Sequence, residues 1–160
     1  MIRDLSAWIE QHAVSSPDRV AIRFEGTEIS YRALHVRIQK TAGLLHNTHG
    51  VRLGDRVAYL GFNTPECVIV LFACARLGAI YLPLNWRLAL PELDHMLGHA
   101  EPKVLITDSP HRESAVRLVN DRSGCMLIDC ANVVPVSEDS DTALVESNFG
   151  GDPDVPLLLV

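Results

Sequence analysis

Short apolar segments typical of strands alternate with helix-like segments along most of the chain. The strand-like segments are residues 19–24, 27–30, 55–60, 80–84, 103–107 and 125–129. The helix-like segments are residues 6–14, 31–46, 65–77, 92–98 and 110–119. Neighbouring parallel strands need a crossover connection, which is usually a helix. The alternation therefore predicts an α/β fold with a largely parallel sheet.

Capping residues and glycines set the expected ends of the helices. Ser30 and Thr64 each precede a helical pattern and are expected to act as N-caps, and Pro65 suits a first helical position. Gly78 is expected to end the helix that starts at Pro65. That helix is apolar nearly all round, which indicates deep burial.

The first helical segment is less regular. Asp4 or Ser6 is the expected cap, and the spacing of Leu5, Trp8, Ile9 and His12 predicts that they share one face.

Composition excludes several classes of protein. With 48% hydrophobic and 21% charged residues, the chain is expected to form a soluble globular domain rather than a disordered one. A net charge of −6 argues against nucleic-acid binding, which needs surplus Lys and Arg. The longest apolar run, residues 67–75, is too short for a transmembrane segment of about 20 residues. Four cysteines without a CxxC pair favour a reducing, cytoplasmic location.

The last residues have an unusual order. Residues 137–154 are acidic and loop-like, and an apolar run then reaches Val160. Apolar residues of this kind normally form a strand that is followed by a functional loop. We interpret residues 1–160 as part of a domain that is cut before such a loop.

Arg87 is the strongest candidate binding residue. It follows an apolar strand directly, beside Trp86, and a guanidinium at the carboxyl end of a parallel strand can bind a phosphate or carboxylate with two hydrogen bonds. The alternative interpretation is a surface arginine that stacks on Trp86 or pairs with Glu92.

Other familiar catalytic patterns are missing or weak. The chain contains no GxxxxGK[ST], GxGxxG or GxSxG motif. His95 and His99 are one helical turn apart, which could suit a metal ion, but a solvated helix face explains them better. Cys67 and Cys74 share a face of an apolar helix and are expected to be core residues. No catalytic residue and no metal ligand is assigned.

Five segments, taken in order, resemble the amino-terminal part of the adenylate-forming acyl-CoA synthetase (AMP-dependent synthetase/ligase) family. They are SPDRVAI (16–22), ISYRAL (29–34), GVRLGDRVAYLGFNTPE (50–66), FACARLGAIYLPLNWRLALPEL (72–93) and EPKVLIT (101–107). The fourth segment is the most specific. The resemblance covers nearly the whole chain.

The resemblance implies a definite chemistry for the intact enzyme. Family members use ATP and Mg²⁺ to convert a carboxylic acid, here a fatty or aromatic one, into an acyl-adenylate, and then transfer the acyl group to coenzyme A. It also implies that Arg87 contacts a nucleotide phosphate of coenzyme A. The Ser/Thr/Gly-rich phosphate loop that ends in Lys would follow a strand resembling residues 155–160. Residues 1–160 therefore form the amino-terminal portion of the domain, without the small carboxyl-terminal domain, and are expected to be inactive alone and to bind these cofactors poorly.

A second class of function stays open on the sequence. The chain could be a non-catalytic α/β module that pairs with another chain at a sheet edge, either a second copy or a chain that completes a split synthetase.

Overall fold

The computed structural model describes residues 5–120, 122–135 and 157–158. The helices are α1 (Ser6–Ser15), α2 (Tyr31–Asn47), α3 (Pro65–Leu77), α4 (Leu90–Ala100), the 3₁₀ helix η1 (Ser109–His111), α5 (Arg112–Val119) and α6 (Cys130–Val133). The strands are β1 (Val20–Phe24), β2 (Thr27–Ser30), β3 (Arg56–Leu60), β4 (Ile80–Leu84), β5 (Val104–Thr107) and β6 (Met126–Asp129). The acidic segment 137–154 lies outside the described residues.

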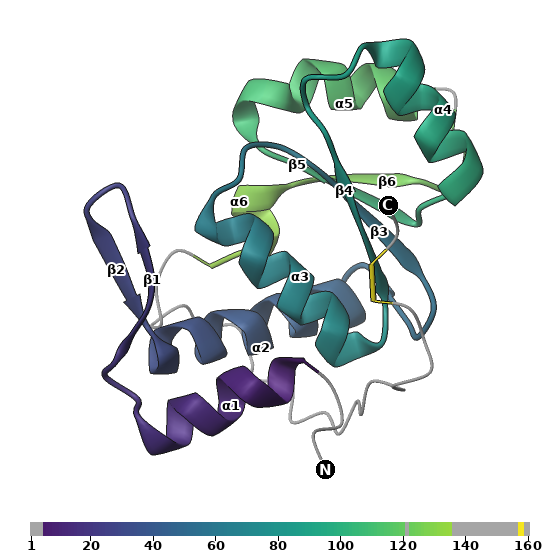
Figure 1. Cartoon of the computed structure of the whole chain (residues 1–160). Coiled ribbons are helices and arrows are strands. Elements are labelled where there is room, and N and C mark those ends of the chain that lie inside the picture. Colours follow the sequence, from purple (N-terminus) through teal and green to yellow (C-terminus); the bar gives the residue numbers. More distant parts are fainter. Residues whose placement is uncertain (1–4, 121, 136–156, 159–160) are drawn as a thin grey trace.

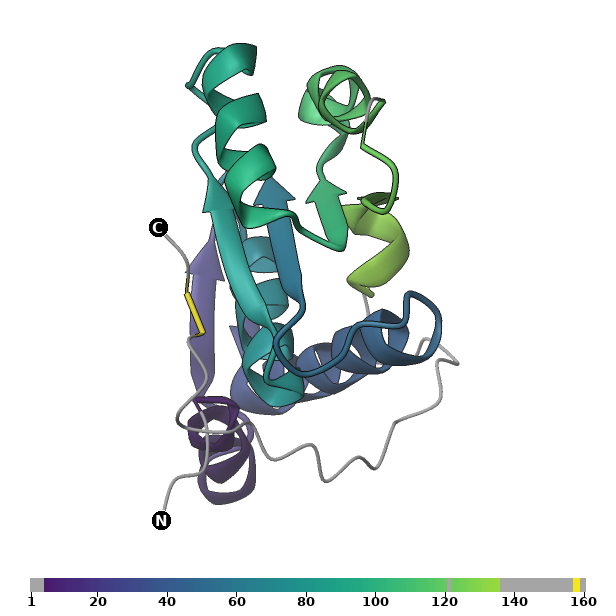
Figure 2. The same ribbon diagram turned by 90° about the vertical axis from the view of Figure 1, so that its right-hand side faces the viewer.

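A four-stranded parallel sheet forms the centre of the molecule (Figure 1). Its order is β4-β3-β5-β6, and all three pairings between neighbours are parallel. Helices cover both faces, with α4 and α5 on one side and α1, α2 and α3 on the other (Figures 1 and 2). The expected α/β fold with a largely parallel sheet is confirmed.

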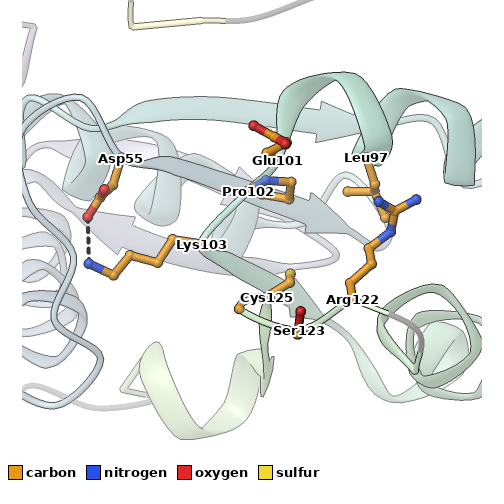
Figure 3. A pocket seen from close by; sticks show the side chains of 9 residues that line it. Asp55, Leu97, Glu101, Pro102, Lys103, Arg122, Ser123 and Cys125 are labelled. Carbon is orange, nitrogen blue, oxygen red and sulfur yellow. Dashed lines mark hydrogen bonds and ion pairs between the residues drawn. The ribbon is translucent and has the colours of Figure 1, made fainter.

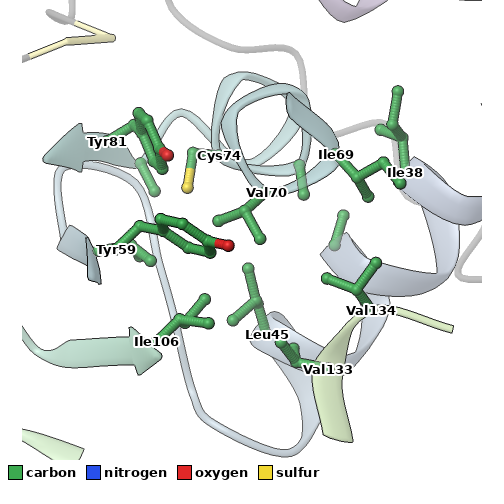
Figure 4. Close-up of a cluster of buried hydrophobic side chains, with 14 of the residues drawn as sticks. Ile38, Leu45, Tyr59, Ile69, Val70, Cys74, Tyr81, Ile106, Val133 and Val134 are labelled. Carbon is green, nitrogen blue, oxygen red and sulfur yellow. The ribbon is translucent and has the colours of Figure 1, made fainter. Parts of the chain in front are cut away.

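Alternating side chains of each strand pack against opposite helical layers. In β3, Val57 and Tyr59 join a core with α2 and α3, whereas Ala58 and Leu60 join a core with α4 and α5. Figure 4 shows the first core, where Tyr59 lies beside Val70 and Leu45, and Tyr81 lies beside Cys74. Full burial of one such aliphatic side chain stabilises the fold by about 1.5–3 kcal/mol. A sheet covered on both faces explains why its strands are almost continuously apolar.

An antiparallel hairpin, β1–β2, stands apart from the main sheet (Figure 1). Its two-residue turn has positive φ at Glu25 (46°) and Gly26 (79°), the conformation that matches the twist of the two strands. Ser30 ends β2 and accepts a hydrogen bond from the Ala33 amide at 3.2 Å. Ser30 is thus the N-cap of α2, as expected from the sequence.

Helix α3 begins and ends at the expected residues, but one detail differs. Gly78 adopts the left-handed conformation (φ 64°) that ends the helix. Thr64 occupies the N-cap position, yet its side chain makes no capping hydrogen bond, and its carbonyl accepts the Cys67 amide instead. The prediction that the Thr64 side chain caps α3 was wrong. None of the described helices combines the length and hydropathy that crossing a membrane would require.

The side chains expected to share one face of α1 are only partly buried. Ile9 is buried, but half of the Trp8 surface is exposed. Leu5 occupies the N-cap position with no side-chain hydrogen bond, so Ser6 is not the cap, and Asp4 lies outside the described residues. Helix α1 packs mainly on α2, while the apolar residues Leu5, Trp8 and Val14 remain exposed.

The free edge of β4 meets a residue from the distant end of the chain. The Tyr81 amide donates to the Leu157 carbonyl at 2.7 Å, and Tyr81 forms a parallel bridge with Leu158. The remaining residues of the expected strand 155–160 lie outside the described residues.

Candidate functional site

The carboxyl ends of three neighbouring strands lie side by side. Leu60 of β3 pairs with Leu84 of β4 on one side and with Thr107 of β5 on the other. The chain segments that follow these strands therefore meet at one edge of the sheet. In open α/β sheets, ligands bind outside the carboxyl ends of the strands. This carboxyl edge contains Arg87, the candidate from the sequence.

Arg87 is exposed and stacks on its neighbour. Its guanidinium carbon lies 4.2 Å from the centre of the Trp86 ring, which is a cation–π contact. Its backbone amide donates to the Asn85 side chain at 3.1 Å. Among the described residues Arg87 forms no ion pair, since Glu92 instead accepts the Ala89 amide at 2.8 Å. A guanidinium held in this way keeps its hydrogen-bond donors for an anion from solution.

Three aromatic rings pack together beneath Arg87. We call Phe62, Trp86 and His111 the aromatic cluster. The Phe62 ring centre lies 5.0 Å from Trp86 and 4.7 Å from His111, both edge-to-face, and Trp86 lies 5.5 Å from His111. Edge-to-face contacts of this kind stabilise by about 0.5–1.5 kcal/mol each. The rings come from segments after β3, β4 and β5, so the cluster joins three connections into one unit.

Asp108 holds two of those connections through its carboxylate. Oδ2 accepts the Phe62 amide at 2.9 Å. Oδ1 accepts the His111 amide at 3.1 Å and lies 2.5 Å from His111 Nδ1. A carboxylate can only accept, so Nδ1 carries the proton in this contact. The sequence analysis missed Asp108, Phe62 and His111, and their only signal was their position just after expected strands.

A hollow of about 560 Å³ lies at the opposite, amino edge of the sheet (Figure 3). Its walls are Asp55, Leu97, Glu101, Pro102, Lys103, Arg122, Ser123, Gly124 and Cys125. Lys103 Nζ donates to the Gly50 carbonyl at 2.6 Å and to Asp55 at 2.9 Å. Arg122 donates to the carbonyl and carboxylate of Asp94, both at 2.6 Å. Both cations therefore have protein partners among the described residues, and neither is free to bind an anion.

The histidine and cysteine candidates gain no chemical role. His95 and His99 lie 4.5 Å apart by ring centres, but the described residues contain no group of three side chains that could hold a metal ion. All four cysteines are unpaired. Burial raises the pKa of the Cys74 and Cys67 thiols, which makes them poor nucleophiles.

Comparisons with known proteins agree with the fold and the motifs. The family model for AMP-binding enzymes matches residues 9–156. Indoleacetate–CoA ligase of Aromatoleum aromaticum is 46% identical over 105 residues, which are 66% of this chain and 20% of that protein. Feruloyl-CoA synthase of an Amycolatopsis species is 43% identical over 118 residues, which are 74% of this chain and 24% of that protein.

A solved structure has the same fold over nearly the whole chain. The N-terminal domain of FACL13 from Mycobacterium tuberculosis is 24% identical, with a TM-score of 0.84 over 98% of this chain and 41% of that one. This chain spans only about a fifth to a quarter of the length of the two ligases above. The match to the family model covers far more than half of residues 1–160, and so the chain belongs to the family of AMP-binding enzymes.

Proposed function

We propose that the chain supplies the amino-terminal part of an acyl-CoA synthetase. In that enzyme a fatty or aromatic carboxylic acid reacts with ATP to give an acyl-adenylate and pyrophosphate, and the acyl group then passes to coenzyme A. The observation that carries the proposal is the 46% identity to a protein named as an acid–CoA ligase. The names of the two ligases, indoleacetate and feruloyl, favour an aromatic acid over a fatty one.

Arg87 is the residue of this chain that we assign to a substrate. We propose that it contacts a phosphate of coenzyme A. The exposed guanidinium, stacked on Trp86 and without a carboxylate partner among the described residues, suits a phosphate. A phosphate monoester is the best match, because it offers up to two negative charges and three unsubstituted oxygens to the planar donors of arginine.

The remaining catalytic groups are not found in residues 1–160. The sequence contains no Ser/Thr/Gly-rich loop that ends in Lys. Negative charge develops on the phosphates during adenylation, so donors and cations must stand around them. The described residues offer no group of three ligands for the Mg²⁺ ion, which we assign to no residue here. We therefore propose that residues 1–160 alone do not catalyse adenylation and bind ATP and coenzyme A weakly.

An exchange assay tests both halves of this proposal. The purified chain is incubated with ATP, Mg²⁺, labelled pyrophosphate and a panel of aromatic and fatty acids. We expect no acid-dependent exchange from the chain alone, and exchange from a protein that extends it through the phosphate loop and small domain. Exchange by residues 1–160 would disprove the proposed inactivity. Its absence from the extended protein with every acid would disprove the proposed reaction.

The domain assignment has a separate test at the gene. We propose that residues 1–160 are the amino-terminal portion of a larger adenylate-forming domain. The DNA that follows the codon for Val160 is read in all three frames, and we expect one frame to encode a Ser/Thr/Gly-rich loop that ends in Lys. Unrelated sequence in every frame would contradict the assignment. We also propose a cytoplasmic location, because the four unpaired cysteines suit a reducing compartment.

A further inference from the structure

The Asp108 carboxylate makes more contacts than its local role requires. Asp108 is the N-cap of η1, and capping needs only the hydrogen bond from the His111 amide. The same carboxylate also accepts the Phe62 amide and meets His111 Nδ1. The first contact connects the segment after β5 to the segment after β3, 46 positions away, and the second orients the His111 ring within the segment after β5.

Gly61 shows how closely the carboxylate fits. A Cβ on Gly61 would lie 2.9 Å from Asp108 Oδ2 and 3.0 Å from its Cγ, and 3.1 Å from Tyr59 Cε1. Any side chain here would push the carboxylate away from the Phe62 amide. Glycine at this position therefore keeps Asp108 in hydrogen-bond range.

The position of Arg87 depends on the rings below it. Phe62 and His111 both contact Trp86, and the guanidinium of Arg87 lies over the Trp86 ring. Among the described residues, the Asp108 carboxylate forms its hydrogen bonds and ion pair with Phe62 and His111, and none with Arg87 or Trp86. The contacts that lead from Asp108 toward Arg87 run through the aromatic cluster.

We propose that Asp108 and His111 are positioning residues for Arg87. Asp108 holds Phe62 and His111 against Trp86, and the Trp86 ring sets where the Arg87 guanidinium meets a phosphate. The inference rests on the phosphate contact proposed above for Arg87. It adds a function for two residues that touch no substrate themselves.

Asp108→Asn separates positioning from capping. Asparagine caps helices as well as aspartate does, so η1 keeps its cap. With its Oδ1 kept toward the His111 amide as the cap, its NH₂ group takes the place of Oδ2 and faces the Phe62 amide as a second donor. His111→Asn is the complementary variant, because it keeps an N–H near Asp108 but removes the ring. Asp94→Asn is the matched control at the amino edge, where Asp94 accepts from Arg122 at 2.6 Å.

The first measurement needs no ligand. The NMR resonance of Arg87 Hε reports the ring current of Trp86, and hence the position of the guanidinium over the ring. We expect Asp108→Asn and His111→Asn to shift this resonance while Asp94→Asn leaves it in place. An unchanged resonance in both folded variants would overturn the proposal. Should neither variant fold, Gly61→Ala displaces the carboxylate by steric contact, and the same shift is expected.

The second measurement uses coenzyme A as the probe, titrated into the 160-residue chain by NMR, which detects weak binding. We expect Asp108→Asn and His111→Asn each to raise Kd about five-fold, as for the loss of one net hydrogen bond, and Asp94→Asn to have no effect. Arg87→Ala distinguishes the two proposals. Unchanged binding in Arg87→Ala would disprove the phosphate contact, while the Hε resonance would still decide the positioning. Weaker binding in Arg87→Ala together with unchanged binding in both other variants would overturn the positioning alone.

Discussion

An arginine at the amino edge of the sheet and an arginine at the carboxyl edge use their side chains in opposite ways. At the amino edge, Arg56 donates to the Ala100 carbonyl at 2.7 Å and to the Glu101 carbonyl at 3.0 Å, and so satisfies the carboxyl end of α4. At the carboxyl edge, Arg87 donates only its backbone amide within the described residues and rests its side chain on Trp86. The first arginine holds the fold together, whereas the second is available to a ligand.

If Arg87 binds a phosphate as proposed, the hollow at the amino edge is not the binding site. The amino edge has a hollow of about 560 Å³, but its cations are already hydrogen-bonded to the protein. The carboxyl edge projects an aromatic cluster and an unpaired guanidinium instead. Substitutions at the amino edge should therefore change stability, and substitutions at the carboxyl edge should change binding.

Leu97→Ala should have the largest effect. Leu97 is fully buried in the core beneath α4 and also lines the amino-edge hollow. Truncation of a buried leucine leaves a cavity, and we expect the free energy of unfolding to fall by about 3 kcal/mol in urea denaturation. Leu97→Met, which conserves volume, should cost less than about 1.5 kcal/mol. An Arg87 Hε resonance that moved in a folded Leu97→Ala variant would show that the two edges are coupled.

Arg56→Ala and Arg87→Ala test the comparison directly. Removal of Arg56 leaves two helix-end carbonyls without their charged donor, and we expect a loss of about 2 kcal/mol in the free energy of unfolding. Removal of Arg87 should change that free energy by less than about 0.5 kcal/mol, because the side chain is exposed. Both variants are measured by urea denaturation at the same pH. Equal losses of stability would contradict the division of roles between the edges.

Much of the fold could be predicted from the sequence because local signals decide it. The order of strands and helices, the Ser30 cap and the Gly78 helix end all follow from turn chemistry and hydrophobic pattern. The position of Arg87 after a strand, and its stacking on Trp86, could also be predicted from the sequence.

The rest of the site depends on which strands are neighbours. Phe62 and Asp108 are 46 positions apart and meet only because β3 lies beside β5 in the sheet. Nothing in the spacing of these residues encodes that order. The exposure of Trp8 and the missing side-chain cap at Thr64 have a similar cause, because tertiary contacts and not the local pattern decide them.

Cys125 and Cys130 lie just outside the two ends of β6 and allow the two edges to be compared by thiol reactivity. Cys125 precedes the strand at the amino edge and is half-buried, whereas Cys130 follows the strand and is buried in the first core. Burial raises the pKa of both thiols, that of Cys130 to about 12. Only the thiolate reacts, so at pH 9 we expect a thiol reagent to label Cys125 faster than Cys130 in a Cys67→Ser background. Urea should make the two rates equal. Faster labelling of Cys130 in the folded chain would contradict its burial.

His49 should give the smallest effect, again at the amino edge. Its Nδ1 lies 3.1 Å from Met126 Sδ, and burial lowers the pKa of its imidazole. The unfolded chain, with a histidine pKa of about 6.5, then binds more protons than the folded one at lower pH. The contribution of His49 to stability is complete above pH ~6.5 and is lost as the pH falls below that value.

Burial also lowers the pKa of His35 in α2, so the two histidines act with the same sign and must be separated. We expect the loss of unfolding free energy between pH 7.5 and 5.5 to be smaller in His49→Gln than in the parent chain, and smaller again when His35→Gln is added. Urea denaturation at both pH values measures each step. An identical loss in the parent and His49→Gln would contradict the lowered pKa of His49 and mean that the amino edge accommodates its imidazolium. A charge would then be tolerated at both edges of the sheet, and the contrast between them would rest on the arginines alone.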